Sequence, residues 1–396
     1  MIIKTYISQI KQEENLMKNA TFMFSTGVVS AIFSILSTLI FSRFLGPSGY
    51  GLFKIAMGLA STAAYLLDVG VKFLIPRYIA EFEAKKQPEN IAHLLEKTLL
   101  IKAVIAIVVL IITWFFSQSI SQIFFHSKDL EILVWPSMLI FLIVFLDITV
   151  PILIGYQNFK LVALSSILVP FTHIIFGLPL VYILGIRGLL LAASLAFISG
   201  SIPAIRFIIK KAKRGVRLRS FSYKSAYINY SLPVYFSSFP TYIYIVIIPL
   251  LSLFYTQKQV GYYSFSLSFY TAVQLFPLTL ANVMFPKVAQ LHSRNKKASA
   301  YQTFKRLLII YTPVAICGSI LSVSAIHPIV RLLVPAFLPA TKIIIIQVIA
   351  SFIMGYFFIT VYYVTAINKL KIATVLNWIL SISFGTLAYY LAGLTK

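Results

Sequence analysis

Residues 44–53 read FLGPSGYGLF, and they lie where one long apolar run of the chain, 19–43, gives way to a second, 49–79. As helices, both runs are long enough to cross a hydrocarbon layer about 30 Å thick, which takes roughly 20 residues. More such runs follow outward along the chain, at approximately 94–118, 132–155, 161–184, 188–209, 226–254, 260–285, 303–325, 341–366 and 371–394. Backbone groups in lipid must be satisfied within each segment, and the runs lack the alternation of barrel strands. We therefore expect an all-α polytopic membrane protein with about 11 transmembrane helices.

The composition supports a membrane protein and excludes most soluble classes. Of the 396 residues, 59% are hydrophobic and 11% are charged, whereas an ordinary soluble domain carries about 25% charged residues. That leaves too few charges to cover the surface of a soluble enzyme of this length. The single cysteine, Cys317, lies in an apolar run, so the chain can form no internal disulfide and no cysteine-based metal site.

The excess of positive charge follows the expected topology. The chain has 34 Lys and Arg residues against 10 Asp and Glu, a net charge of +24. Most basic residues gather at the N-terminus and in alternate connections, with the densest cluster at 210–224. Because cytoplasmic segments are enriched in Lys and Arg, we expect a cytoplasmic N-terminus, with residues 1–18 as an amphipathic lead-in, and a C-terminus outside the cell. The charge thus indicates a protein of the cytoplasmic (plasma) membrane and no nucleic-acid partner.

The chain resembles itself at an offset of about 210 residues, which is typical of transporters built from two related halves. The matched pairs, in chain order, are Gly49-Tyr50 with Gly261-Tyr262, Lys85-Lys86 with Lys296-Lys297, and Asn158 with Asn368. We expect a six-helix bundle at 19–209, a basic cytoplasmic linker at 210–224 and a five-helix bundle at 225–396. The counterpart of the span that follows Gly185 would begin at the last residues, so the second bundle is predicted to lack its sixth helix.

Three motifs indicate a family. Residues 44–53 (FLGPSGYGLF), 67–71 (LDVGV) and 76–80 (PRYIA) resemble the signature of the Wzx-type polysaccharide biosynthesis flippases of the MATE-like MOP (multidrug/oligosaccharidyl-lipid/polysaccharide) exporter superfamily. The resemblance implies two helical bundles around a central cavity, lined mainly by the first, second, seventh and eighth helices. It implies that alternating access carries a polyprenyl-pyrophosphate-linked oligosaccharide, such as a polysaccharide or O-antigen precursor, across the membrane. A glycan polymerase or a glycosyltransferase would then be a candidate partner, beside the membrane lipids.

Charged side chains inside spans cost about 2.5–3.5 kcal/mol each to insert, so each needs a role. Asp68 and Lys72 stand four residues apart in the second run. They either form a neutralised pair or place Lys72 at a substrate phosphate, with Asp68 orienting it. Arg77 follows at the expected cytoplasmic mouth, and Arg43 and Lys54 would extend the basic track. The predicted anion-binding residues are therefore Lys72, Arg77, Arg43 and Lys54.

Three further groups lie within the apolar runs. Lys102 is close to the start of the third run, so we expect its amine to snorkel to the cytoplasmic headgroups. Asp147 in the fourth run is predicted to pair with a neighbouring helix or a hydroxyl. Orienting a cation or coupling transport to an ion is a role that Asp147 and Asp68 could share. His173 in the fifth run is expected to be a buried, hydrogen-bonded histidine.

Uncharged polar residues supply further candidates. The first run carries a stripe of small polar residues, each four apart: Thr26, Ser30, Ser34 and Thr38. Small residues at this spacing favour close helix packing, and a cavity wall is the alternative. The predicted sugar contacts are Tyr235 and Tyr242 in the seventh run, with Gln274 and Asn282 in the eighth.

The sequence predicts neither an enzyme nor a bound cofactor or metal. It has no glycine-rich phosphate loop followed by Lys-Ser/Thr, and its 5 histidines are scattered. The main alternative to a flippase is a cation-coupled multidrug antiporter of the same superfamily, whose cavity should carry acidic residues. The first, seventh and eighth runs carry none, which favours an anionic substrate. A non-transporting, truncated membrane scaffold is the third hypothesis.

Overall fold

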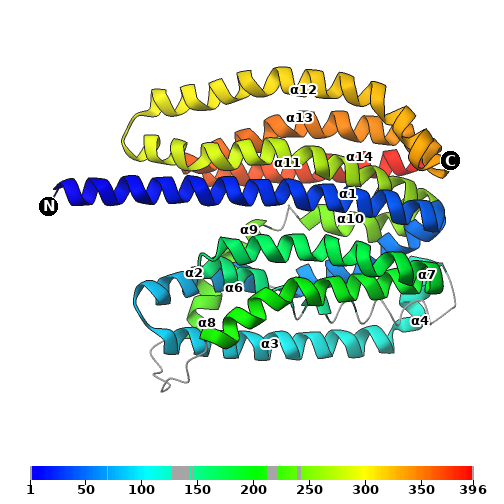
Figure 1. Cartoon of the computed structure of the whole chain (residues 1–396), viewed down its shortest axis with the longest axis horizontal. Coiled ribbons are helices and arrows are strands. Elements are labelled where there is room, and N and C mark those ends of the chain that lie inside the picture. The colour runs from blue at the N-terminus through cyan, green and yellow to red at the C-terminus, as the bar shows by residue number, and fades with distance from the viewer. Residues whose placement is uncertain are drawn as a thin grey trace.

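The computed structural model describes residues 2–68, 70–126, 139, 142–144, 146–211, 222–238 and 242–394, with side chains from Phe22 onward. These ranges are helical and contain no strand. Most of the long helices run side by side along one axis, and the two chain ends lie at opposite ends of the bundle (Figure 1). The all-α architecture predicted from the apolar runs is confirmed.

The helices fall into two groups along the chain. The first group comprises α1 (Ile2–Asp68), α2 (Val71–Ala84), α3 (Pro88–Phe115), α4 (Ser117–Ile120), the π-helix η1 (Ser121–Phe125), α6 (Thr149–Gly155) and α7 (Phe159–Lys211). The second comprises α8 (Tyr223–Ala226), the π-helix η2 (Tyr227–Ser231), α9 (Leu232–Ser238), α10 (Ile243–Ser252), α11 (Gln257–Ser293), α12 (Lys297–Leu333), the 3-10 helix η4 (Pro335–Ala340), α13 (Thr341–Ala366) and α14 (Leu370–Gly393). Of the predicted linker 210–224, residues 212–221 lie outside the described ranges.

Seven helices of the described chain are long and apolar enough to cross a membrane. Two of these, α1 and α7, bend at Gly46 and Gly185, so each contains two of the predicted runs. Gly46 has φ 63, a conformation that glycine adopts readily. Two shorter apolar helices, Leu142–Gly155 and Ile243–Ser252, fall within the fourth and seventh predicted runs. The protein is therefore a multi-pass membrane protein.

The second predicted run, 49–79, is not one continuous helix. The helix α1 ends at Asp68 and α2 begins at Val71, because Gly70 adopts a left-handed conformation with φ 86. A Cβ on Gly70 would lie 2.5 Å from the carbonyl oxygen of Ser231, so the close approach of η2 also requires glycine here. Asp68 and Lys72, which the sequence places in one apolar run, therefore lie in two different helices.

The internal repeat is visible in the turns that connect the helices. Lys86 after α2 and Asn295 after α11 both have positive φ, and so do Gln157 after α6 and Asn368 after α13. Both pairs keep the offset of about 210 residues. The same backbone hydrogen bond closes the first two turns at 2.9 Å, from Gln87 to Phe82 and from Lys296 to Leu291. The repeat is confirmed, but Lys86 corresponds to Asn295 and Gln157 to Asn368, a shift of one or two residues from the predicted matches.

The two halves meet where α1 crosses α11. A Cβ on Gly51 would lie 1.9 Å from the backbone oxygen of Gln257, and a Cβ on Gly261 would lie 1.9 Å from the backbone oxygen of Pro47. Each contact is the counterpart of the other in the repeat. The turns α2–α3 and α11–α12 lie at the end of the bundle where the chain begins (Figure 1).

Candidate functional site

A cavity of about 850 Å³ is walled mainly by the first half, by α1, the segment 142–150 and α7, and the second half contributes Ser268, Thr271, Ala272 and Leu275 of α11. Its wall is rich in hydroxyl groups: Thr26, Ser30, Ser34, Ser37, Thr38, Thr149, Ser165, Ser166, Ser201, Ser268 and Thr271. Of the charged residues, Lys54 and Asp147 are among the described side chains that line it. A wall of this kind can exchange hydrogen bonds with a highly hydroxylated ligand.

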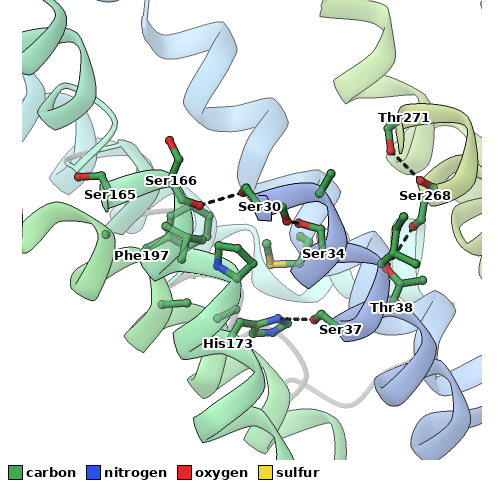
Figure 2. A pocket seen from close by; sticks show the side chains of 18 of the residues that line it. Ser30, Ser34, Ser37, Thr38, Ser165, Ser166, His173, Phe197, Ser268 and Thr271 are labelled. Atoms are coloured by element: carbon green, nitrogen blue, oxygen red, sulfur yellow. Dashed lines mark hydrogen bonds between the residues drawn. The ribbon is translucent and has the colours of Figure 1, made fainter. Parts of the chain in front are cut away.

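The polar stripe of α1 forms part of this wall. Figure 2 shows Ser30, Ser34 and Thr38 on the same helix, facing α7 and α11 across the cavity. Thr26 belongs to the lining as well. The favoured interpretation of the stripe as a close-packed helix interface is therefore corrected in favour of a cavity wall. The small side chains leave the space that larger ones would fill.

Hydrogen bonds from α1 reach both halves of the molecule. The Ser30 hydroxyl donates to the carbonyl oxygen of Ser166 on α7 at 2.9 Å, and the Thr38 hydroxyl donates to the Ser268 hydroxyl on α11 at 3.3 Å (Figure 2). Because both bonds include cavity-lining hydroxyls, a bound ligand could compete for them.

His173 lies deeper in the same wall. Its Nδ1 is 3.0 Å from the Ser37 hydroxyl, and its ring stacks on Phe53 with centroids 5.9 Å apart and packs edge-on against Phe41. The prediction of a buried, hydrogen-bonded histidine is confirmed by these contacts. Lys54 lies over the ring of Tyr50 at 5.3 Å, where it supplies positive charge to this part of the cavity.

A buried ionic cluster borders the cavity. The Nζ of Lys102 on α3 lies 2.8 Å from Oδ1 of Asp68 and 3.0 Å from Oδ1 of Asp147. Lys102 is fully buried, Asp68 is 1% exposed and Asp147 is 24% exposed. The expectation that the Lys102 amine reaches the headgroups is therefore wrong. The predicted pairing of Asp147 with a neighbouring helix is confirmed, because its partner is Lys102 on α3. A buried ammonium requires such acceptors, because an unpaired charge in the membrane is costly.

Lys72 is arranged differently from its sequence-based expectation. Its Nζ lies 4.0 Å from the ring centroid of Tyr65 and 4.7 Å from that of Tyr242. Asp68 accepts a hydrogen bond from the backbone N–H of Lys72 at 3.2 Å, so it stabilises the first turn of α2. Among the described residues no carboxylate forms an ion pair with the Lys72 amine. Lys72 is half-buried, and its amine lies against the aromatic faces of Tyr65 and Tyr242.

The other predicted anion-binding residues are separated from the cavity. Arg77 is exposed on α2, with its guanidinium 3.8 Å from the ring centroid of Tyr230. Arg43 is exposed on α1. Of the four predicted cations, only Lys54 lines the cavity, while Lys72 lies beside the ionic cluster. The structure therefore does not bring the four together into one track.

The predicted sugar contacts are not on the cavity wall either. Tyr235 and Tyr242 are both 5% exposed, and the Tyr235 hydroxyl donates to the carbonyl oxygen of Leu66 at 3.2 Å. Their rings pack against each other with centroids 5.6 Å apart. Gln274 is half-buried beside the cavity-lining Leu275, and Asn282 is exposed on α11. The structure places none of these four residues on the wall of this cavity, so their contact with a sugar stays a prediction.

Sequence comparison assigns the family. The sequence model of the family described as polysaccharide biosynthesis protein matches residues 16–292. The chain belongs to this family. No curated protein matches the chain in sequence. The family match includes α1, α2 and α11, which form the crossing between the halves, and it includes all residues of the ionic cluster.

Solved structures with the same fold are transporters. An inward-facing MATE-family multidrug transporter of the MOP superfamily is 13% identical with a TM-score of 0.68, over 92% of this chain and 90% of that one. The lipid II flippase MurJ in an inward closed conformation is 18% identical with a TM-score of 0.70, over 94% of this chain and 84% of that one. These similarities confirm the predicted MOP-superfamily fold for this polysaccharide biosynthesis family member.

Proposed function

We propose that the protein is a flippase that moves a polyprenyl-pyrophosphate-linked oligosaccharide from the cytoplasmic to the outer leaflet by alternating access. The observation that carries this proposal is the cavity of about 850 Å³ that α1 and α7 form against α11, with its hydroxyl-rich wall and the cation Lys54. Membership in a polysaccharide biosynthesis family supports a glycan precursor as the cargo. The protein has no proposed catalytic residue, because the cargo is moved and not converted.

The lining matches the two parts of such a head group. Sugar rings offer many hydroxyls that can donate and accept, and Ser and Thr side chains pair with both kinds of group. A pyrophosphate needs positive charge, which Lys54 provides on the wall and Lys72 provides nearby. The polyprenyl tail would remain in the lipid, because its transfer out of hydrocarbon is unfavourable. In this proposal the protein binds the head group, and the membrane lipids hold the polyprenyl tail.

The crossing of α1 and α11 supports alternating access. Tyr50 and Phe53 line the cavity next to the contact of Gly51 with Gly261, so the crossing bounds the cavity at this end. If the basic turns face the cytoplasm, the crossing closes the outer side. Separation of the two halves at the glycines would then open the cavity outward.

A cation-coupled multidrug antiporter is the second candidate, and Asp147 favours it because this acid lines the cavity. However, Asp147 is engaged by Lys102, which reduces its attraction for an organic cation. Drug efflux from cells that express the protein would support the antiporter. A membrane scaffold that does not transport is the third candidate. It predicts that glycan export survives every cavity substitution that leaves the protein inserted.

Export of surface glycan in cells that depend on this protein tests the flippase directly. Lys54→Ala is expected to reduce export at least about tenfold, because Lys54 is the one lysine or arginine among the described residues of the cavity wall. Lys258→Ala is the matched control, because Lys258 also lies over a tyrosine ring, Tyr262, at 6.0 Å but does not line this cavity. Normal export by Lys54→Ala protein, inserted at wild-type level, would contradict the proposed site.

A further inference from the structure

Two lysines and two aspartates lie near the break between α1 and α2. The two lysines differ in how they contact the aspartates. Lys102 contacts both carboxylates, at 2.8 Å from Asp68 and 3.0 Å from Asp147. Lys72 has no ion pair with either of them within the described chain, and its amine lies over Tyr65 and Tyr242. The two ammonium groups are therefore not equivalent.

Burial explains which lysine holds the acids. Lys102 is fully buried, so its ammonium has only protein groups to replace its hydration, and carboxylates are the strongest of these. Lys72 is half-buried, and aromatic faces together with the exposed part of its surroundings can stabilise its charge. The acids therefore stabilise the cation that needs them most.

Asp68 nevertheless contacts the backbone of Lys72. Its Oδ2 already accepts the backbone N–H of Lys72 at 3.2 Å, while its Oδ1 binds Lys102. The lysine side chain is a flexible four-carbon stem with three donors at its tip. Without Lys102, a short rotation would allow the Lys72 amine to replace the lost ammonium at the carboxylate.

We propose that Lys102 is a positioning residue: it occupies both intramembrane carboxylates and thereby leaves the Lys72 amine available for the anionic head group of the substrate. The proposal rests on the proposed function, in which that head group is a pyrophosphate. Lys102 itself does not line the cavity and is not expected to touch the substrate. Its effect on the substrate passes through Asp68, Asp147 and Lys72.

The test measures binding of geranylgeranyl pyrophosphate to the purified full chain in lipid nanodiscs. In Lys102→Met, the freed carboxylates are expected to pair with Lys72, so that binding weakens at least about tenfold. Removing the carboxylates as well, in Lys102→Met/Asp68→Asn/Asp147→Asn, is expected to restore wild-type binding. Asparagine at position 68 can still accept the backbone N–H of Lys72, so the turn into α2 is retained. Lys97→Met, at an exposed position of α3, is the matched control.

The outcomes separate this proposal from a purely structural role. If Lys102→Met folds and binds the probe as the wild type does, or if the triple variant stays as weak as Lys102→Met, the proposal is wrong. If Lys102→Met does not fold, the comparison moves to Lys102→Met/Asp147→Asn, which retains Asp68 to capture Lys72. Weak binding by this double variant with full binding by the triple variant supports the proposal, and equal binding overturns it.

Other binding results would contradict the proposed flippase function rather than the role of Lys102. If the wild-type protein does not bind the pyrophosphate probe, the anionic substrate site is wrong whatever Lys102 does, whereas normal binding by Lys72→Ala rejects only the role of Lys102 through Lys72. Binding that depends on Lys72 but is indifferent to Lys102 would leave the flippase proposal intact and reject only the positioning role.

Discussion

Gly51 of α1 and Gly261 of α11 cross at backbone contact. A Cβ on either residue would lie 1.9 Å from a backbone oxygen of the other helix, that of Gln257 or of Pro47. Backbone cannot yield as a flexible side chain can, so only glycine permits the two halves to approach this closely. The contact also joins corresponding parts of the repeat, which makes it a natural point for the halves to separate.

Alanine at this crossing is expected to favour separation of the halves. In Gly51→Ala/Gly261→Ala, the added methyl groups should destabilise the closed crossing by about 1–3 kcal/mol, the usual cost of overpacking. Spin labels on S48C and K258C, two exposed positions beside the crossing, measure the result in a Cys317→Ser background. We expect a longer distance than in the parent protein.

Gly385→Ala is the control for this prediction. A Cβ on Gly385 would lie 3.6 Å from the nearest side-chain atom, of Ile243, which is an ordinary contact. Unchanged distances in both the double variant and the control would show that the glycine crossing does not determine the separation of the halves.

Loss of Lys102 is expected to destabilise the protein in a way that depends on its acids. Lys102→Met leaves two carboxylates without their ammonium, and breaking a buried ion pair in this manner costs about 3–5 kcal/mol. Thermal unfolding in detergent should therefore show a clearly lowered midpoint, and Asp68→Asn/Asp147→Asn in the same chain should recover most of it. A midpoint for Lys102→Met equal to that of the exposed-site variant Lys97→Met would refute a stabilising ion cluster.

The sequence was sufficient to predict the helices and the repeat, because both depend on long apolar runs and on turns that recur along the chain. The sequence was not sufficient to predict that Lys102 is buried. How deep Lys102 lies in the membrane depends on the residue at which its helix begins. The apolar run starts near residue 94, but α3 begins at Pro88, so Lys102 lies about 20 Å along the helix. At that depth its amine meets Asp68 and Asp147, which are distant in sequence.

The cavity wall was partly predictable for the same reason. The four-residue spacing of the α1 stripe correctly placed its residues on one face, but spacing does not tell whether that face meets another helix or a space. That depends on the neighbours: Ser165 and Ser166 of α7 and Ser268 of α11 are small as well. Tyr235 and Tyr242 illustrate the reverse, since their position in the seventh run gave no sign that Tyr242 lies beside the Lys72 amine or that Tyr235 packs against Tyr242.

A larger side chain in the stripe distinguishes a cavity wall from a packing interface. Ser34→Leu is expected to leave the thermal stability nearly unchanged, because Ser34 is exposed within the cavity. Glycan export should fall, because the leucine occupies space that the head group needs. Ser324→Leu on α12 is the control, an exposed serine that does not line the cavity and also bonds the carbonyl four residues before it. Stability loss with normal export in Ser34→Leu would favour the packing interface.

The orientation of the chain in the membrane can be tested with tags at its ends. The bundle places the two ends on opposite sides (Figure 1), and the basic turns lie with the N-terminus, so the positive-inside rule predicts a cytoplasmic N-terminus and an outside C-terminus. A C-terminal alkaline phosphatase fusion should be active and a C-terminal green fluorescent protein fusion should be dark. The opposite pair of signals would reverse the orientation that the flippase proposal assumes.

Transbilayer movement of a lipid-linked oligosaccharide in reconstituted vesicles tests the proposed flippase activity itself. The purified chain is placed in liposomes with a fluorescent short-chain polyprenyl-pyrophosphate oligosaccharide, and an impermeant reagent measures the fraction in the outer leaflet over time. We expect wild-type protein to move the lipid across the bilayer, and we expect Lys54→Ala to slow this movement at least about tenfold while Lys258→Ala does not. Equal rates in protein-free liposomes and in liposomes with wild-type protein would contradict the account.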